Sequence, residues 1–167
     1  MVSEWGVMRM GEDIVLNYLG PMKAEVPLDG GRKLTIETKT SYPIEGKIEF
    51  HFSTDSDRDV TLWIREPSWI HTRLWKGTPK VRDKGPVGYE GILCPANKST
   101  VASFEFDMPL RAVFGDMEQL GKVSIYRGPI LLAYDQTLND FDANAIPPID
   151  VDQIEKEGGG IKILDQE

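Results

Sequence analysis

Apolar side chains alternate with polar ones along several short stretches, and this two-residue period constrains the fold more than any other feature of the chain. Over residues 48–53 Ile and Phe alternate with Glu, His and Ser, and similar patterns occur at 34–39, 60–64 and 104–108. Because successive side chains of a β-strand point to opposite faces, each stretch predicts a strand with one buried face.

Turn signals separate these stretches. Residues 29–32 (Asp-Gly-Gly-Arg) are typical of a hairpin turn, residues 55–59 form a polar loop, and Pro67 and Pro109 each end a strand. Residues 123–134 are more continuously apolar, which predicts two deeply buried strand pieces. Short strands at such spacing, with no long amphipathic helix, predict an all-β fold: an antiparallel, jelly-roll-like β-sandwich.

The composition changes after Asp135. With 167 residues the chain is long enough to bury one core, and we assign residues 1–135 to the β-sandwich domain. Residues 136–167 are acidic, contain prolines and include the run Gly158–Gly160. We expect this segment to be an extended or partly disordered tail, or the start of a further element.

Charge and cysteine content exclude several classes of function. A formal net charge of −8 argues against nucleic acid and anionic membranes as partners, because both are bound by Lys and Arg patches. Cys94 is the one cysteine, so the chain has neither an internal disulfide nor a multi-cysteine zinc site. No His or Cys stands beside it, and we expect a small, half-buried structural cysteine.

Asp55, Asp57 and Asp59 have the spacing of the first ligands of a calcium loop, with Glu66 at the twelfth position. Val60 stands where that loop needs glycine, and a strand over 60–65 would carry Glu66 away. A solvated acidic hairpin is the favoured interpretation, and no metal site is predicted.

Three aromatic residues are candidates for sugar or domain-interface contacts. Trp63 is out of phase with its apolar neighbours, so it faces away from that strand's apolar side, while Trp75 and Tyr89 fall in turn-rich segments. Exposed rings on a β-sandwich can stack on sugars or pack against another domain. A domain interface is the favoured interpretation, and a sugar-binding site remains the alternative.

Five short sequence motifs follow one another along the chain: Ile-Val-Leu-Asn-Tyr at 14–18, Tyr-Pro-Ile-Glu-Gly at 42–46, Leu-Trp-Ile-Arg-Glu-Pro-Ser-Trp at 62–69, Met-Pro-Leu-Arg at 108–111 and Tyr-Arg-Gly-Pro at 126–129. In this order they resemble the C-terminal β-sandwich region of bacterial β-L-arabinofuranosidase-like glycoside hydrolases, glycoside hydrolase family 127. The resemblance runs from about Asp13 to Asp135. In that family a catalytic helical toroid precedes the sandwich.

The resemblance implies structural roles for a set of motif residues. These are Tyr42, Pro43, Arg65, Pro67, Trp69, Arg111, Arg127, Gly128 and Pro129. Trp69 would close one end of the sandwich, and Gly128 would allow a bulge or a close backbone approach. Alternatively, the three arginines would hold the sandwich to the toroid through ion pairs.

The family's catalytic apparatus is a cysteine nucleophile on a zinc ion within the toroid, and nothing in this chain matches it. The resemblance therefore implies zinc only in the toroid, and no cofactor or catalytic residue in this chain. We expect a non-catalytic ancillary domain that packs against the toroid and can support a homo-oligomer. An independent carbohydrate-binding module is the alternative, and a small enzyme would need two convergent carboxylates that no spacing indicates. The parent's sugar specificity and its location, bacterial cytoplasm or periplasm, stay open.

Overall fold

The computed structural model of the chain describes residues 3–77, 81–82, 85–133, 137–138, 142, 155–157 and 160–162. It divides into two compact units, residues 1–108 and 109–167, which we describe separately. In the described part, no helix is long and apolar enough to cross a bilayer.

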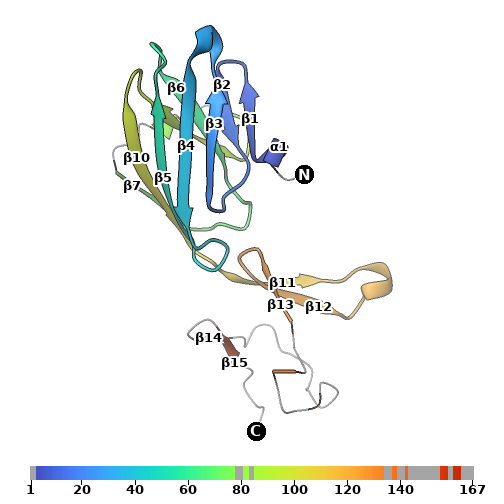
Figure 1. The fold of residues 1–167 in the computed structure, drawn as a ribbon. Coiled ribbons are helices and arrows are strands. Elements are labelled where there is room, and N and C mark those ends of the chain that lie inside the picture. The colour runs from blue at the N-terminus through green and yellow to red at the C-terminus, as the bar shows by residue number, and fades with distance from the viewer. Residues whose placement is uncertain are drawn as a thin grey trace. The chain divides into compact units, whose positions relative to one another are not determined.

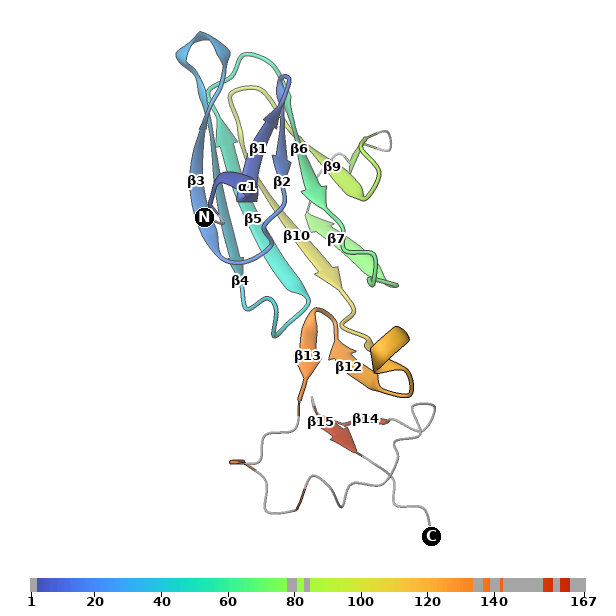
Figure 2. The ribbon, with the colours of Figure 1, turned by 90° about the vertical axis from the view of Figure 1, so that its right-hand side faces the viewer.

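The first unit is a sandwich of two five-stranded sheets, which Figures 1 and 2 show as separate layers. One sheet has the order β1 (Val7–Met10), β2 (Asp13–Leu16), β6 (Val60–Arg65), β9 (Tyr89–Cys94) and β8 (Val81–Arg82). The other has the order β3 (Met22–Pro27), β4 (Lys33–Thr40), β5 (Lys47–Thr54), β10 (Ser99–Phe106) and β7 (Arg73–Gly77). The predicted all-β sandwich is confirmed.

Two short helices complete this unit: α1 (Ser3–Gly6) precedes β1, and the 3-10 turn η1 (Asp29–Gly31) joins β3 to β4 at the predicted hairpin. One pairing departs from the predicted antiparallel pattern, because β2 and β6 run parallel. As a result both strands end on the same side of the sandwich.

The core lies between the two sheets and follows the predicted alternation on three strands. In β5 the side chains of Ile48, Phe50 and Phe52 are buried, and the intervening ones are only half-buried. The same holds for Leu34 and Ile36 in β4 and for the inward-facing residues of β10. These large apolar side chains supply the burial that stabilises the unit.

The predicted exposure of Trp63 is wrong. Trp63 does face away from the core side of β6, yet its side chain is only 4% exposed. A Cβ added at Gly85 or Gly91 would lie 1.9 or 2.5 Å from the indole ring, so these glycines let the backbone cover it closely. The indole N–H also donates to an Asp13 carboxylate oxygen at 3.1 Å. Trp63 is a packed structural residue that presents no ring face to solvent.

The second unit begins earlier than the boundary we placed after residue 135. Its first sheet joins β11 (Leu110–Phe114), β12 (Val123–Arg127) and β13 (Ile130–Leu132), with the 3-10 turn η2 (Met117–Gln119) between β11 and β12. Among the described strands these three pair only with one another, so they form a sheet of their own. A hairpin of β14 (Glu155–Glu157) and β15 (Gly160–Lys162) follows, and most of the predicted tail lies outside the described residues.

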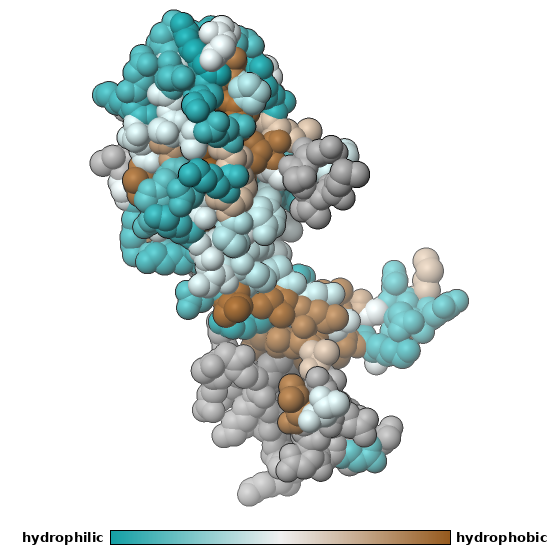
Figure 3. All heavy atoms as spheres, viewed as in Figure 1, coloured by the Kyte–Doolittle hydropathy of each residue, from teal (hydrophilic) through white to brown (hydrophobic). Residues whose placement is uncertain are grey.

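One face of the three-stranded sheet is mostly apolar. The register places seven apolar residues on it, together with Arg127: Leu110, Ala112, Phe114, Val123, Ile125, Ile130 and Leu132. Figure 3 shows apolar atoms gathered over these strands. The predicted deep burial of residues 123–134 is wrong for the described part, because β12 and β13 are half-buried at most and Leu131 is 53% exposed.

Candidate functional site

A cleft at one end of the sandwich brings together residues from three of the five sequence motifs. Its walls come from the segment after β2, from the loop after β4 and from the end of β6 with the turn that follows it. The cleft encloses about 370 Å³ and is lined by Asn17, Tyr18, Leu19, Tyr42, Arg65, Pro67, Ser68 and Trp69. We call this the end cleft. The parallel pairing of β2 with β6 explains why residues 48 positions apart meet here, since Val15 pairs with Trp63 in register.

Two aromatic walls of the end cleft rest on the core. The rings of Tyr42 and Trp69 each pack edge-on against Phe106, both with centroids 6.0 Å away. Burial raises the pKa of the Tyr42 hydroxyl above its ordinary value, and the positive charge of Arg65 offsets part of that effect. The hydroxyl is therefore neutral near pH 7 and can donate a hydrogen bond.

Hydrogen bonds hold the remaining wall, which the segment after β2 forms. The Tyr89 hydroxyl donates to the side-chain oxygen of Asn17 at 2.6 Å, and the Asn17 amide donates to the Trp5 carbonyl at 2.9 Å. The Asn17 backbone N–H donates to Gly6 at 2.8 Å. The neighbouring ring of Tyr18 is 41% exposed. The cleft is thus formed before any partner arrives and presents one free aromatic face.

The turn after β6 is held by Asp107, the residue that follows β10. Asp107 accepts hydrogen bonds from the backbone N–H groups of His71 and Thr72 at 3.0 and 2.9 Å. Burial alone would raise the pKa of this carboxyl, but those two N–H groups lower it overall. Its charge is therefore kept at neutral pH, and the segment carrying Pro67, Ser68 and Trp69 is held in place.

A larger groove adjoins the end cleft at Tyr18. It encloses about 710 Å³ along the open edge of the sandwich, between β1 and β3. Its lining includes Val7, Met22 and Val26, so it is largely apolar. Tyr18 lines both hollows, which makes the two a continuous surface.

The sequence-predicted aromatic candidates do not form one platform. Trp75 lies on the edge strand β7, and its ring stacks on Phe104 with centroids 4.5 Å apart, so it faces the core. Tyr89 lies on β9 rather than in a turn and supports Asn17 beside the end cleft. Asn17 and Tyr18 are not among the predicted site residues, although the motif at 14–18 contains both.

The motif residues of the second unit lie in and beside its three-stranded sheet, with Arg111 and Arg127 on opposite faces. Gly128 and Pro129 are the two-residue turn between β12 and β13, where Gly128 takes a φ of 55°. Gly128 therefore serves a hairpin turn and not a bulge. The Arg111 guanidinium lies 4.6 Å from the Tyr126 ring centroid. The buried Nε atoms of Arg111 and Arg127 have no hydrogen-bond partner.

The three aspartates of the acidic loop between β5 and β6 do not converge on one point. Asp55 accepts the Lys33 N–H, Asp57 pairs with Arg32, and Asp59 accepts the Ala96 N–H. The three carboxylates thus have separate partners. Among the described residues no group of His, Cys, Asp or Glu could hold a metal ion.

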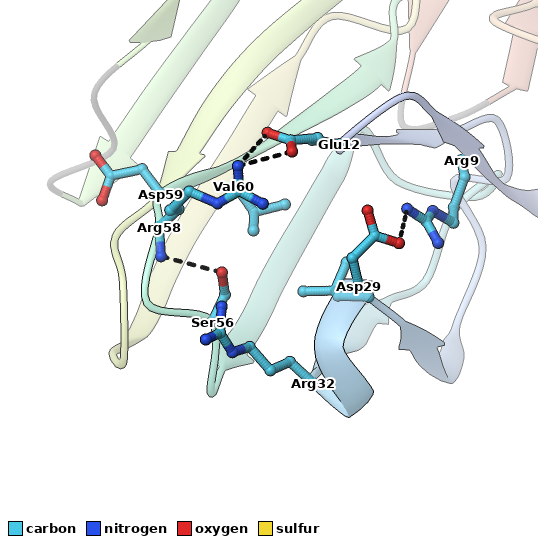
Figure 4. A pocket seen from close by; sticks show the side chains of 9 residues that line it. Arg9, Glu12, Asp29, Arg32, Ser56, Arg58, Asp59 and Val60 are labelled. Atoms are coloured by element: carbon cyan, nitrogen blue, oxygen red, sulfur yellow. Dashed lines mark hydrogen bonds and ion pairs between the residues drawn. The ribbon is translucent and has the colours of Figure 1, made fainter.

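The opposite end of the sandwich carries a charged cluster, shown in Figure 4. Arg58 pairs with Glu12 at 2.7 Å, and Arg9 pairs with Asp29 at 3.0 Å. The hollow between these residues encloses about 20 Å³, room for a water molecule at most. The hollow is too small for a ligand larger than water, so we assign no binding role to this cluster.

One pair of half-buried carboxylates, Glu66 and Glu90, converges on a single cation, the guanidinium of Arg73. A glycosidase needs two carboxyl groups opposed across a bound sugar. Here an arginine lies between them, and neither residue lines the end cleft. This pair gives no support to a hydrolytic site.

Cys94 is 0% exposed, and burial raises the pKa of its thiol to about 11, with a smaller contribution from the charge of Asp59. The thiolate fraction near pH 8 is then about a hundredfold below that of an ordinary thiol. We expect native protein to react with an aromatic disulfide reagent at least about a hundredfold more slowly than unfolded protein. Equal rates would contradict the burial of Cys94.

The fold and the site together define a class: a β-sandwich module with a preformed end cleft and no assembled catalytic group among the described residues. Residues 13–108, more than half of the chain, match the family model for the middle domain of GH127 β-L-arabinofuranosidases. The chain belongs to this family. No curated protein matches it.

Solved structures share the fold. A GH127 β-L-arabinofuranosidase from Geobacillus stearothermophilus T6 matches 78% of this chain at 20% identity with a TM-score of 0.62. A protein described as a glycoside hydrolase matches 78% at 20% identity with a TM-score of 0.66, and a GH127 β-arabinofuranosidase matches 76% at 22% identity with 0.61. The chain spans only 21–23% of the length of these proteins.

Proposed function

We propose that this chain is a non-catalytic accessory domain of a GH127-type glycoside hydrolase, and that the end cleft is the surface by which it packs against the catalytic domain of its parent. The observation that carries the proposal is that three sequence motifs, far apart along the chain, converge on one preformed cleft. A catalytic role for the chain alone has no support from the described carboxylates. Two of the three matched structures are described as arabinofuranosidases, which makes an arabinofuranoside hydrolase the proposed parent.

Docking fits the chemistry of the end cleft. Tyr18 offers an exposed ring, Trp69 a half-buried one, and Arg65 a charged group at the mouth. Tyr, Trp and Arg are the residue types most enriched where protein surfaces bind one another. The apolar groove beside Tyr18 extends the same surface.

The test is a titration of the 167-residue chain with the separately produced catalytic part of its parent, followed by calorimetry. We expect a one-to-one complex, and about tenfold weaker binding for Tyr18→Ala, because interface aromatics contribute 1 kcal/mol or more. The control is Val101→Ala, an exposed residue of β10 that lies away from the cleft. Absence of any complex would refute the proposal.

A carbohydrate-binding module is the second candidate, and one observation favours it: the end cleft combines the exposed ring of Tyr18 with the polar side chain of Ser68. Rings of this kind stack on sugars. This candidate predicts calorimetric binding of arabinan oligosaccharides that Tyr18→Ala abolishes. No heat with wild-type protein would rule it out.

A further inference from the structure

The arginines of the first unit whose side chains the structure describes fall into two groups. Arg9, Arg32, Arg58 and Arg73 each form an ion pair with a carboxylate. Arg65 forms none with any described residue, although the chain has 27 acidic and only 19 basic residues. The carboxylates near it along the chain or across the sheet are committed elsewhere: Glu66 and Glu90 to Arg73, and Asp107 to the N–H groups of His71 and Thr72.

Arg65 is also placed where a partner would cover it. It is the last residue of β6, it is exposed, and it lines the end cleft with Tyr42 and Trp69 beside it. A guanidinium carries five N–H donors in a fixed fork. Covering it with an apolar surface would remove water from those donors without replacing the hydrogen bonds, which is strongly unfavourable.

Resting on the proposed docking function, we propose that the protein segment seated in the end cleft carries an Asp or Glu side chain that pairs with Arg65. A carboxylate satisfies the guanidinium fork with two parallel hydrogen bonds. The neutral hydroxyl of Tyr42 supplies a further donor at the same mouth. Residues 1–108 carry 16 acidic and 14 basic residues, so their charges nearly balance. The attraction of an acidic segment is therefore local to the unpaired Arg65, which fixes where the segment docks.

The experiment compares two arginine substitutions in the same titration with the catalytic part of the parent. Arg65→Ala should weaken binding at least about thirtyfold, because truncating one member of a covered charge pair leaves the other unpaired. Arg58→Ala removes the same charge at the opposite end of the sandwich and should change the affinity less than about twofold. Arg65→Lys should bind with intermediate affinity, because lysine keeps the charge and loses the fork.

Two further readouts separate the possible failures. The melting temperature of Arg65→Ala should equal that of wild type, since Arg65 has no described partner within the chain. Equal affinities for Arg65→Ala and Arg58→Ala would overturn the inference and leave the docking function standing. Absence of a complex with wild type would overturn both. Binding of an oligogalacturonide that depends on Arg65, with no complex formed, would assign the site to acidic sugars and overturn the proposal.

Discussion

Replacing Trp63 with alanine should lower the free energy of unfolding by about 3–5 kcal/mol, the range for removing a large buried aromatic side chain. The ring is 4% exposed and is covered closely by Gly85 and Gly91. Its loss leaves a cavity and removes the 3.1 Å hydrogen bond to Asp13. Urea unfolding followed by circular dichroism measures the change.

Trp5→Ala is the matched control, because it removes the same side chain from a position that is 67% exposed. We expect its effect to stay within about 0.5 kcal/mol. If the two variants lost equal stability, Trp63 would not be the packed residue that the structure shows. A loss of glycan binding by Trp63→Ala without loss of stability would restore it as a sugar contact.

Replacing Gly46 with alanine should cost about 2–3 kcal/mol. An added Cβ would lie 2.1 Å from the carbonyl oxygen of Phe106, and that backbone atom cannot rotate away. The Phe106 N–H also donates to the Gly46 carbonyl at 2.8 Å, so the displacement would weaken a hydrogen bond between the loop after β4 and the end of β10. The same loop carries Tyr42, so the shape of the end cleft would change as well.

Gly6→Ala controls for the general effect of adding a methyl group. The nearest atom to its added Cβ, the Cβ of Tyr18, lies 3.4 Å away, which is near ordinary contact distance. Thermal melts should therefore show a clear decrease for Gly46→Ala and little change for Gly6→Ala. Similar melting temperatures for both variants would contradict the close approach at Gly46.

The strands were predictable from sequence where one face of a sheet is buried and the other is open to water. That condition holds in β4 and β5, where Leu34, Ile36, Phe50 and Phe52 point inward in turn. The condition fails in β6, because Gly85 and Gly91, which lie far along the chain, cover its outer face at Trp63. The alternation of apolar and polar residues does not show that a distant segment covers a strand.

Sheet membership and the site were harder to predict, since both depend on pairing between distant segments. The period-2 pattern identifies β12 and β13 as strands, but it cannot show that they pair with Leu110–Phe114 instead of joining the sandwich. The end cleft depends on the parallel pairing of β2 with β6, which brings Asn17 and Tyr18 to Arg65. The sequence motifs contain Asn17, Tyr18 and Arg65 but do not indicate that these residues meet.

The central claim, docking through the end cleft, is tested most directly by hydrogen–deuterium exchange of this chain alone and mixed with the catalytic part of its parent. Exchange reports, segment by segment, which backbone amides a partner protects. The account predicts slower exchange on binding at residues 17–19 and 65–70, and no change at residues 55–59 at the opposite end. A complex that protects residues 55–59 and leaves the end cleft unprotected would contradict it.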